Sequence, residues 1–147
     1  MRLTVYTDYS LRVLLYLGVK GKEQLSTVQE ISDKYNISKN HLTKVTHELG
    51  KMGIIETVRG RGGGIRLKLD PKDINIGETV RKTEDDFHLV ECFNCAINEC
   101  VITPVCRLKG VLHEALNAYF KVLESYTLAD FVENNEGLAS ILLSEQL

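Results

Sequence analysis

The sequence has no hydrophobic run long enough to cross a membrane. The apolar stretch at residues 11–17 is interrupted by Arg12 and falls far short of the roughly 20 residues that a spanning helix needs. The N-terminus does not resemble a secretory signal, because Arg2, Asp8 and Arg12 interrupt it and no small-residue cleavage site follows. These absences predict a cytoplasmic protein without a membrane partner.

Catalytic arrangements and prolines are also scarce. The sequence shows no Ser, His and Asp set for nucleophilic catalysis, and the glycines of residues 60–64 do not lead into a helix as a phosphate-binding loop does. An enzyme is therefore the least favoured class, and no catalytic residue is assigned. Pro71 and Pro104, the two prolines, interrupt no long periodic segment. The 147 residues, 44% hydrophobic and 26% charged, suit one compact domain with an appended helix.

Charge is divided unevenly along a chain whose net charge is only −2. Residues 34–68 contain eight Lys or Arg and two acids, a balance of +6, whereas residues 110–147 contain one Lys and six acids, a balance of −5. A basic segment in a near-neutral chain indicates a localised anion-binding surface. An ordinary solvated face explains the charge equally well, so charge alone does not assign a partner.

Hydrophobic periodicity in the N-terminal half predicts three helices. The first opens at residues 7–10. The second follows Ser26 and Gln29, which fit a capping box with Ser26 at the N-cap. After a short turn at residues 36–37, Ser38 caps a third helix, whose apolar face runs from Leu42 to Met52. Two short helices joined by so tight a turn predict a helix-turn-helix.

Two short strands are predicted after these helices, at residues 54–58 and 65–69. They flank the basic, glycine-rich segment 59–64, and this pattern is typical of a β-hairpin. A hairpin directly after a helix-turn-helix is a wing. A fourth helix is predicted at residues 76–84.

The last third of the chain predicts a long amphipathic helix. Thr103 and Pro104 fit its N-cap and first residue, and an apolar stripe runs from Leu108 to Tyr126, about five turns. This stripe exceeds what a small core needs, which favours a dimerisation helix, with packing on its own domain as the alternative. A short helix at 128–132 and a tail at 137–147 follow. The predicted fold class is mostly α with a small β-hairpin wing: a winged helix-turn-helix domain plus a long dimerisation helix.

The predicted recognition helix and wing carry residue types that bind DNA. The N-terminal part of a recognition helix enters the major groove, where Asn pairs with adenine and Lys reaches guanine or phosphates. Arginines on a glycine-rich hairpin suit the minor groove or its flanking phosphates. Each signal alone is modest, but their order predicts binding to double-stranded DNA. The candidate DNA-binding residues are Ser38, Lys39, Asn40, His41, Thr43, Lys44, Arg59 and Arg61.

All four cysteines, Cys92, Cys95, Cys100 and Cys106, lie within fifteen residues. In a cytosolic protein, such a cluster favours metal or redox chemistry over structural disulfides. Structural zinc sites usually pair two short CxxC units, and only Cys92 and Cys95 match that spacing. Iron–sulfur clusters accept less uniform spacing, which favours a cluster here. Thiol-based redox sensing through disulfides stays open as a competitor.

The order of these motifs resembles the family of iron–sulfur winged-helix repressors. The likeness lies in residues 7–9, 38–42 and 59–63 and in the cysteine loop before a long helix, and it extends to about residue 132. Residues 91–108 and 127–130 are most similar to the members that sense nitric oxide. The resemblance implies a homodimer with a 4Fe–4S cluster in each subunit.

Carried over residue by residue, the resemblance implies that Cys92, Cys100 and Cys106 hold the cluster together with Asp8 of the partner subunit. This sequence departs from the family through the additional Cys95 and a gap from Cys92 to Cys100 that is longer than in many members. Cys95 is therefore a candidate ligand, a spare thiol or a substitute for Cys92. Asp8 has a simpler explanation as an acid in the first helical turn, close to Arg12.

The resemblance also implies a function. The dimer would bind a palindromic operator, repress transcription, and lose operator affinity when nitric oxide nitrosylates the cluster. A winged-helix regulator that responds to iron–sulfur status or to thiol redox state is the alternative. The expected organisation is a DNA-binding domain at 1–84, a cluster-binding loop at 85–106, a dimerisation helix region at 104–132 and a C-terminal tail at 133–147.

Overall fold

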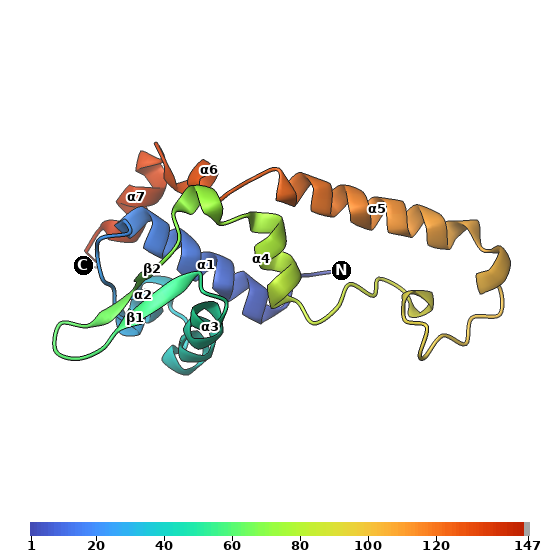
Figure 1. The fold of residues 1–147 in the computed structure, drawn as a ribbon, viewed down its shortest axis with the longest axis horizontal. Coiled ribbons are helices and arrows are strands. Elements are labelled where there is room, and N and C mark those ends of the chain that lie inside the picture. Colours follow the sequence, from blue (N-terminus) through green and yellow to red (C-terminus); the bar gives the residue numbers. More distant parts are fainter. Residues whose placement is uncertain (146–147) are drawn as a thin grey trace.

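The computed structural model describes residues 1–145 and divides them into a compact body and a projecting arm (Figure 1). Residues 146 and 147 of the expected tail lie outside the described residues. In the described chain, no helix is both long enough and apolar enough to span a membrane. The elements are α1 (Val5–Lys20), α2 (Val28–Tyr35), α3 (Lys39–Lys51), β1 (Ile55–Val58), β2 (Gly64–Leu67), α4 (Ile76–Thr83), α5 (Arg107–Glu124), α6 (Ala129–Val132) and α7 (Glu136–Leu143).

The body is built around α1, whose residues Val13, Leu14 and Leu17 are buried in the hydrophobic core. Helix α3 buries Leu42, Val45 and Leu49, the i, i+3, i+7 pattern of one helical face, against the same core. Strands β1 and β2 pair antiparallel, with Ile55 opposite Leu67 and Val58 opposite Gly64. The expected mostly α fold with a hairpin wing is confirmed.

The helix starts differ from the sequence expectations in three places. Helix α1 begins at Val5, and Thr4 caps it. The capping box of α2 is formed by Thr27 and Glu30, so the assignment to Ser26 and Gln29 was wrong by one residue. Ser26 cannot cap because it forms a β-bridge with Ile65, with N–O distances of 2.9 and 2.8 Å. Ser38 stands at the N-cap of α3, but its side chain makes no capping hydrogen bond.

The C-terminal third also differs from expectation. Thr103, Pro104 and Val105 form a separate 3-10 turn, so Cys106 is the N-cap of the long helix and Arg107 its first residue. Part of the segment expected to be a tail folds as α7, which packs on α1. The Lys34 ammonium of α2 donates to the carbonyl oxygens of Ile141 and Ser144 and so satisfies the end of α7.

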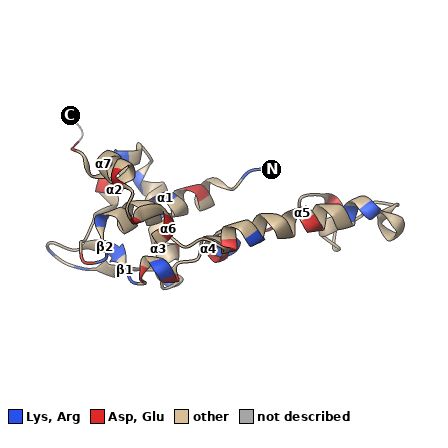
Figure 2. Cartoon of the chain, turned by 90° about the horizontal axis from the view of Figure 1, so that it is seen from above, with Lys and Arg blue, Asp and Glu red and all other residues tan. Residues whose placement is uncertain are grey.

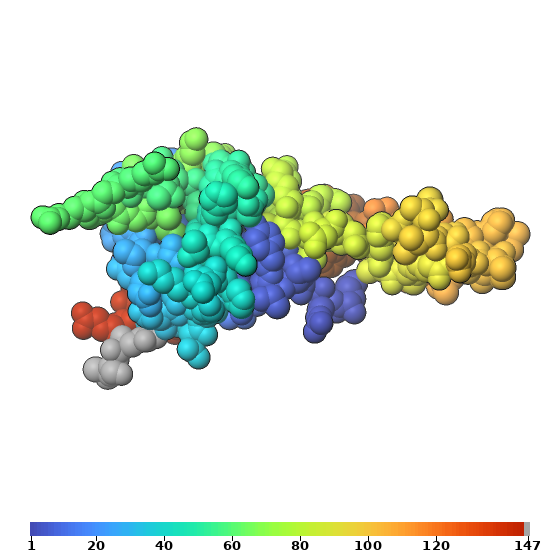
Figure 3. Space-filling view, turned by 90° about the horizontal axis from the view of Figure 1, so that it is seen from below, coloured from blue at the N-terminus to red at the C-terminus, as the bar shows by residue number. Residues whose placement is uncertain are grey.

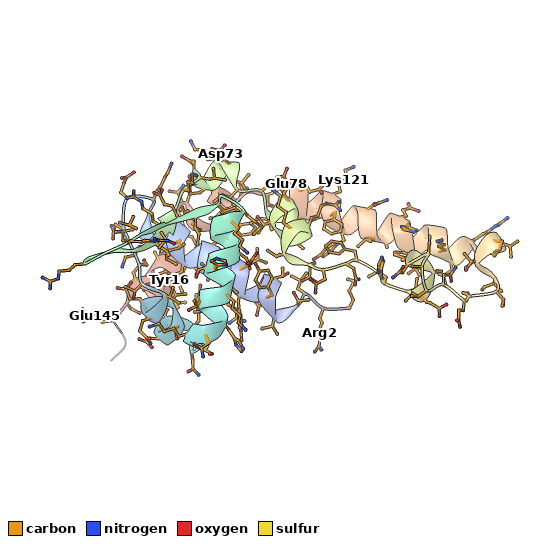
Figure 4. The ribbon with its side chains drawn as sticks, turned by 60° about the horizontal axis from the view of Figure 1, so that its bottom comes forward. Arg2, Tyr16, Asp73, Glu78, Lys121 and Glu145 are labelled. Atoms are coloured by element: carbon orange, nitrogen blue, oxygen red, sulfur yellow. The ribbon has the colours of Figure 1, made fainter. Side chains whose placement is uncertain are left out.

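The arm joins the body where α5 meets α4, a region marked by Glu78 and Lys121 in Figure 4. Helix α5 lies entirely within the described residues, and Phe120 is its one buried residue. Gly77 of α4 lies so close to α5 that an added Cβ would stand 2.7 Å from the Glu124 nitrogen and 2.9 Å from its Cα. Glycine is therefore required at this crossing.

We predict that Gly77→Ala destabilises the protein by about 1–3 kcal/mol, because the two helix backbones must move apart. Thermal or urea unfolding measures the change. Gly50→Ala in α3 is the matched control, since an added Cβ there meets no atom within 4 Å. Alanine in that helix should be neutral or stabilising by up to about 1 kcal/mol. Equal stability of Gly77→Ala and wild type would contradict the proposed crossing.

Candidate DNA-reading surface and cluster site

The first turns of α3 present a polar face to solvent. Ser38, Lys39, Asn40, His41, Thr43 and Lys44 are all exposed, whereas the neighbouring Leu42 and Val45 are buried. The apolar residues hold the helix on the body, and their spacing leaves the six polar side chains on the outside. The structure therefore brings together the residues that the sequence placed on a recognition helix.

The wing projects from the same part of the body, and Figure 2 shows basic residues on α3 and on the hairpin, where β2 carries Arg66. Arg59 and Arg61 are exposed at its tip. Gly60 and Gly62 have φ values of 98° and 74°, which favour glycine, and a Cβ on Gly63 would stand 2.9 Å from the Gly60 carbonyl oxygen. The glycines thus allow a tight tip from which both arginines reach outward.

The cysteines lie in the arm, at the opposite end of the molecule from the wing (Figure 3). All four are free thiols. Cys92, Cys100 and Cys106 are half-buried, whereas Cys95 is exposed. Within residues 1–145, no three His, Cys, Asp or Glu side chains are gathered closely enough to hold a metal ion.

Thiolates are the ligands that iron–sulfur clusters take, so the donor set fits such a group. Cys106 is the N-cap of α5 and so stands at the helix end whose dipole favours negative charge, such as that of a thiolate-bound cluster. The three half-buried thiols are the same three that the family resemblance assigns as ligands. The exposure of Cys95 sets it apart from them.

Asp8 lies on α1 of the body, where both its carboxylate oxygens accept from Arg12. The distances are 3.0 Å from Nε to Oδ1 and 2.9 Å from Nη2 to Oδ2, a bidentate pair. These hydrogen bonds raise the pKa of Arg12. In the single chain Asp8 is therefore an i, i+4 partner of Arg12, the simpler of the two roles expected for it.

The Arg12 guanidinium links this pair to two aromatic rings. It lies 5.9 Å from the ring centroids of both Tyr9 and Tyr35. Burial raises the pKa of Tyr35 to about 12, and its hydroxyl donates to the Arg12 carbonyl oxygen at 3.1 Å. Tyr9 in turn lies 6.2 Å from the His41 ring on α3. Asp8 is thus connected through packed side chains to the recognition helix.

Sequence reasoning missed the contacts that join α4 to α1 and to α5 of the arm. The Glu84 carboxylate accepts from the backbone nitrogen of Thr4 at 2.7 Å and from its hydroxyl at 2.9 Å, which ties the start of α1 to the end of α4. Arg81 pairs with Glu124 at 2.7 Å and lies 3.5 Å from the Phe120 ring centroid. Thr4 and Glu84 are 80 residues apart in the sequence, and Arg81 and Glu124 are 43 residues apart. No pattern of neighbouring residues indicates such distant pairs.

A helix-turn-helix with an exposed polar recognition face and a basic wing defines a winged-helix DNA-binding regulator. The sequence model of the Rrf2 family, described as "Iron-dependent Transcriptional regulator", matches residues 3–134. The chain belongs to the Rrf2 family of transcriptional regulators. It is therefore a DNA-binding regulator and not an enzyme, as expected from its sequence.

Close relatives carry one shared description. The chain is 61% identical over 142 residues to the "HTH-type transcriptional regulator NsrR" of Shouchella clausii, covering 97% of this chain and 95% of that protein. It is 60% identical to the protein of the same description from Bacillus subtilis, covering 97% of each. The resemblance stated from the motifs is thereby confirmed at the level of the family.

Solved structures agree on the fold. The oxidized form of Staphylococcus aureus CymR superposes with a TM-score of 0.72 at 23% identity, over 90% of this chain and 97% of that one. T. potens IscR superposes with a TM-score of 0.71 at 23% identity, over 93% of this chain and 90% of that one. At these identities the likeness supports the winged-helix architecture alone.

Proposed function

We propose that this chain is a cytoplasmic, homodimeric repressor that binds a palindromic operator and releases it when nitric oxide reacts with a bound 4Fe–4S cluster. One observation carries the proposal. Three half-buried free thiols lie in a single loop of a chain that is 61% identical, over 97% of its length, to a regulator described as NsrR. Nitric oxide sensing is assigned by this relationship together with the chemistry of the thiols.

The DNA-binding part of the proposal uses the exposed polar face of α3 and the wing. Asn40, Lys39 and Lys44 suit base edges or phosphates in the major groove. Arg59 and Arg61 on the narrow hairpin suit the minor groove or its flanking phosphates. Two copies related by a two-fold axis present two such surfaces, which matches a palindromic operator.

The dimer is supported by the uncovered apolar face of α5. Leu108, Val111 and Val122 are 62%, 57% and 59% exposed in the single chain. Exposed apolar residues at helical spacing are typical of an interface rather than of a solvated surface. A second copy of the same helix offers the same apolar residues in return.

Cys92, Cys100 and Cys106 would hold the cluster, with Asp8 of the partner subunit as the fourth ligand. When bound, the cluster supplies iron that reacts with nitric oxide. Each Asp8 carboxylate oxygen accepts one hydrogen bond from Arg12 in the single chain and keeps a further lone pair, so Asp8 could bind iron while it stays paired with Arg12. Arg12 contacts Tyr9, and Tyr9 contacts His41, so a change in the Asp8–Arg12 pair alters the packing behind the recognition helix.

A thiol-redox regulator is the second candidate, and the exposed thiol of Cys95 favours it. Exposed thiols are the ones that oxidants and other thiols reach. This candidate needs no iron, whereas a regulator of iron–sulfur status needs iron but no response to nitric oxide.

Three candidates are to be distinguished: a nitric oxide sensor, a thiol-redox regulator and a regulator of iron–sulfur status. The test measures the visible spectrum and the operator affinity of the anaerobically purified protein before and after nitric oxide. We predict a brown protein whose visible absorption changes with nitric oxide and whose affinity falls for a duplex selected from random sequences. Peroxide added to the iron-free protein is the control. A colourless protein that responds only to peroxide would overturn the proposal in favour of thiol chemistry, and a brown protein indifferent to nitric oxide would leave iron–sulfur status as the signal.

The wing is tested by Arg59→Ala and Arg61→Ala. Each loss of a phosphate contact should weaken binding and flatten the plot of log affinity against log salt by about 0.9. Fluorescence anisotropy at several salt concentrations measures both effects, with Lys121→Ala on α5 as the control. The visible spectrum should stay unchanged. Wild-type affinity in the double arginine variant would remove the wing from the DNA-binding surface.

The ligand set is tested by replacing each cysteine and Asp8 with alanine. Cys92→Ala, Cys100→Ala and Cys106→Ala should abolish stable cluster binding, whereas Cys95→Ala should retain it, because Cys95 alone is exposed. Asp8→Ala should assemble a more fragile cluster, since a carboxylate binds cluster iron more weakly than a thiolate. Visible absorption and iron content are measured. A colourless Cys95→Ala variant beside a brown Cys92→Ala variant would reverse the assignment of these two residues.

A further inference from the structure

The cysteine loop is anchored by a contact that involves no thiol. Phe93, which follows Cys92 directly, stacks on His113 of α5 with ring centroids 3.9 Å apart and ring planes only 4° apart. Neither residue belongs to the hydrophobic core, and His113 is exposed. The stack therefore attaches the loop to α5 without taking part in the packing of the body.

The position of His113 relative to Cys106 on α5 indicates what this contact does. His113 follows Cys106 by seven residues, about two helical turns, so the two residues lie on the same face of the helix. Cys92 is bonded directly to Phe93, so the contact lies next to this thiol. The stack consequently ties the Cys92 turn to the helix that has Cys106 at its N-cap.

The rest of the loop is ordered from within. The Glu91 carboxylate accepts from the Glu99 nitrogen, and the Asn98 side-chain oxygen accepts from the Cys100 nitrogen at 3.1 Å. The Asn98 amide donates to the Thr103 hydroxyl at 3.1 Å. In the described chain, hydrogen bonds of residues 91–103 all stay within residues 90–105, so they shape the loop but do not attach it to the helix.

We propose that Phe93 and His113 are positioning residues that hold the Cys92 turn on α5 and so retain the cluster. The inference rests on the proposed function. A loop already held near its bound arrangement loses less conformational freedom when its thiols take up a ligand, and it releases that ligand more slowly. The contribution of stacked rings predicts a cluster-loss rate about two- to tenfold higher when the stack is removed.

The test compares three variants of the full-length protein carrying a cluster assembled under anaerobic conditions. His113→Ala removes the stack, His113→Phe keeps an aromatic ring, and Asn117→Ala alters an exposed residue one turn further along α5. An iron(II) chelator is added, and the loss of visible absorbance is followed. We expect faster loss and an altered visible circular dichroism spectrum in His113→Ala, with near-wild-type behaviour in the other two.

The outcomes separate the two proposals. A wild-type protein that assembles no cluster overturns the proposed function itself. A wild-type protein with a cluster, beside a His113→Ala variant that loses it at the same rate, overturns only the positioning role. Loss from His113→Phe as fast as from His113→Ala also overturns it, because the aromatic ring would not be the cause. Thermal unfolding of the cluster-free variants should match wild type, and a lowered midpoint in His113→Ala would indicate a role in the fold instead.

Discussion

The burial of Phe120 is the contact on which the arrangement of body and arm depends. Every other residue of α5, all within the described chain, is at least partly exposed, so this ring carries the packing of the arm. Full burial of an aromatic side chain contributes about 1.5–3 kcal/mol. The Arg81–Glu124 pair beside it is 45% and 40% exposed, and such pairs contribute about 0–1 kcal/mol. Apolar burial therefore dominates, while the Arg81 guanidinium and the perpendicular ring of Phe87 orient the Phe120 ring.

Local patterns predicted the body because its elements are specified by nearby residues. Helical spacing located α3, and the basic glycine-rich segment located the wing between its two strands. The errors arose where distant contacts override a local signal. Ser26 looked like an N-cap, but its backbone pairs with Ile65, 39 residues away, and Thr27 caps instead. Helix α7 was missed although Asn135 caps it, and its contact with Lys34 could not be read from neighbouring residues.

The candidate sites differ in how far the sequence could define them. The candidate DNA-binding residues are all exposed, because a single helix and a single hairpin present them. The proposed cluster ligands are not gathered in the single chain, where Asp8 pairs with Arg12. Spacing identified the thiols, and the family resemblance alone supplied the carboxylate. Neither the spacing nor the family resemblance pointed to His113, because a single histidine on a helix gives no indication of the ring it contacts.

The wing and the cysteine loop lie at opposite ends of the molecule, so a signal from the loop has to cross the molecule to reach α3. Within one chain, one path from the loop to α3 runs along α5 and through Phe120, whose tight packing with α4 resists graded movement. The proposed route through Asp8 of the partner subunit would start in the body itself, because Asp8, Arg12, Tyr9 and His41 form a continuous set of contacts. It also needs no change in the Phe120 junction. On this assignment the two-fold dimer does more than match a palindrome, since each loop acts on the recognition helix of the other chain.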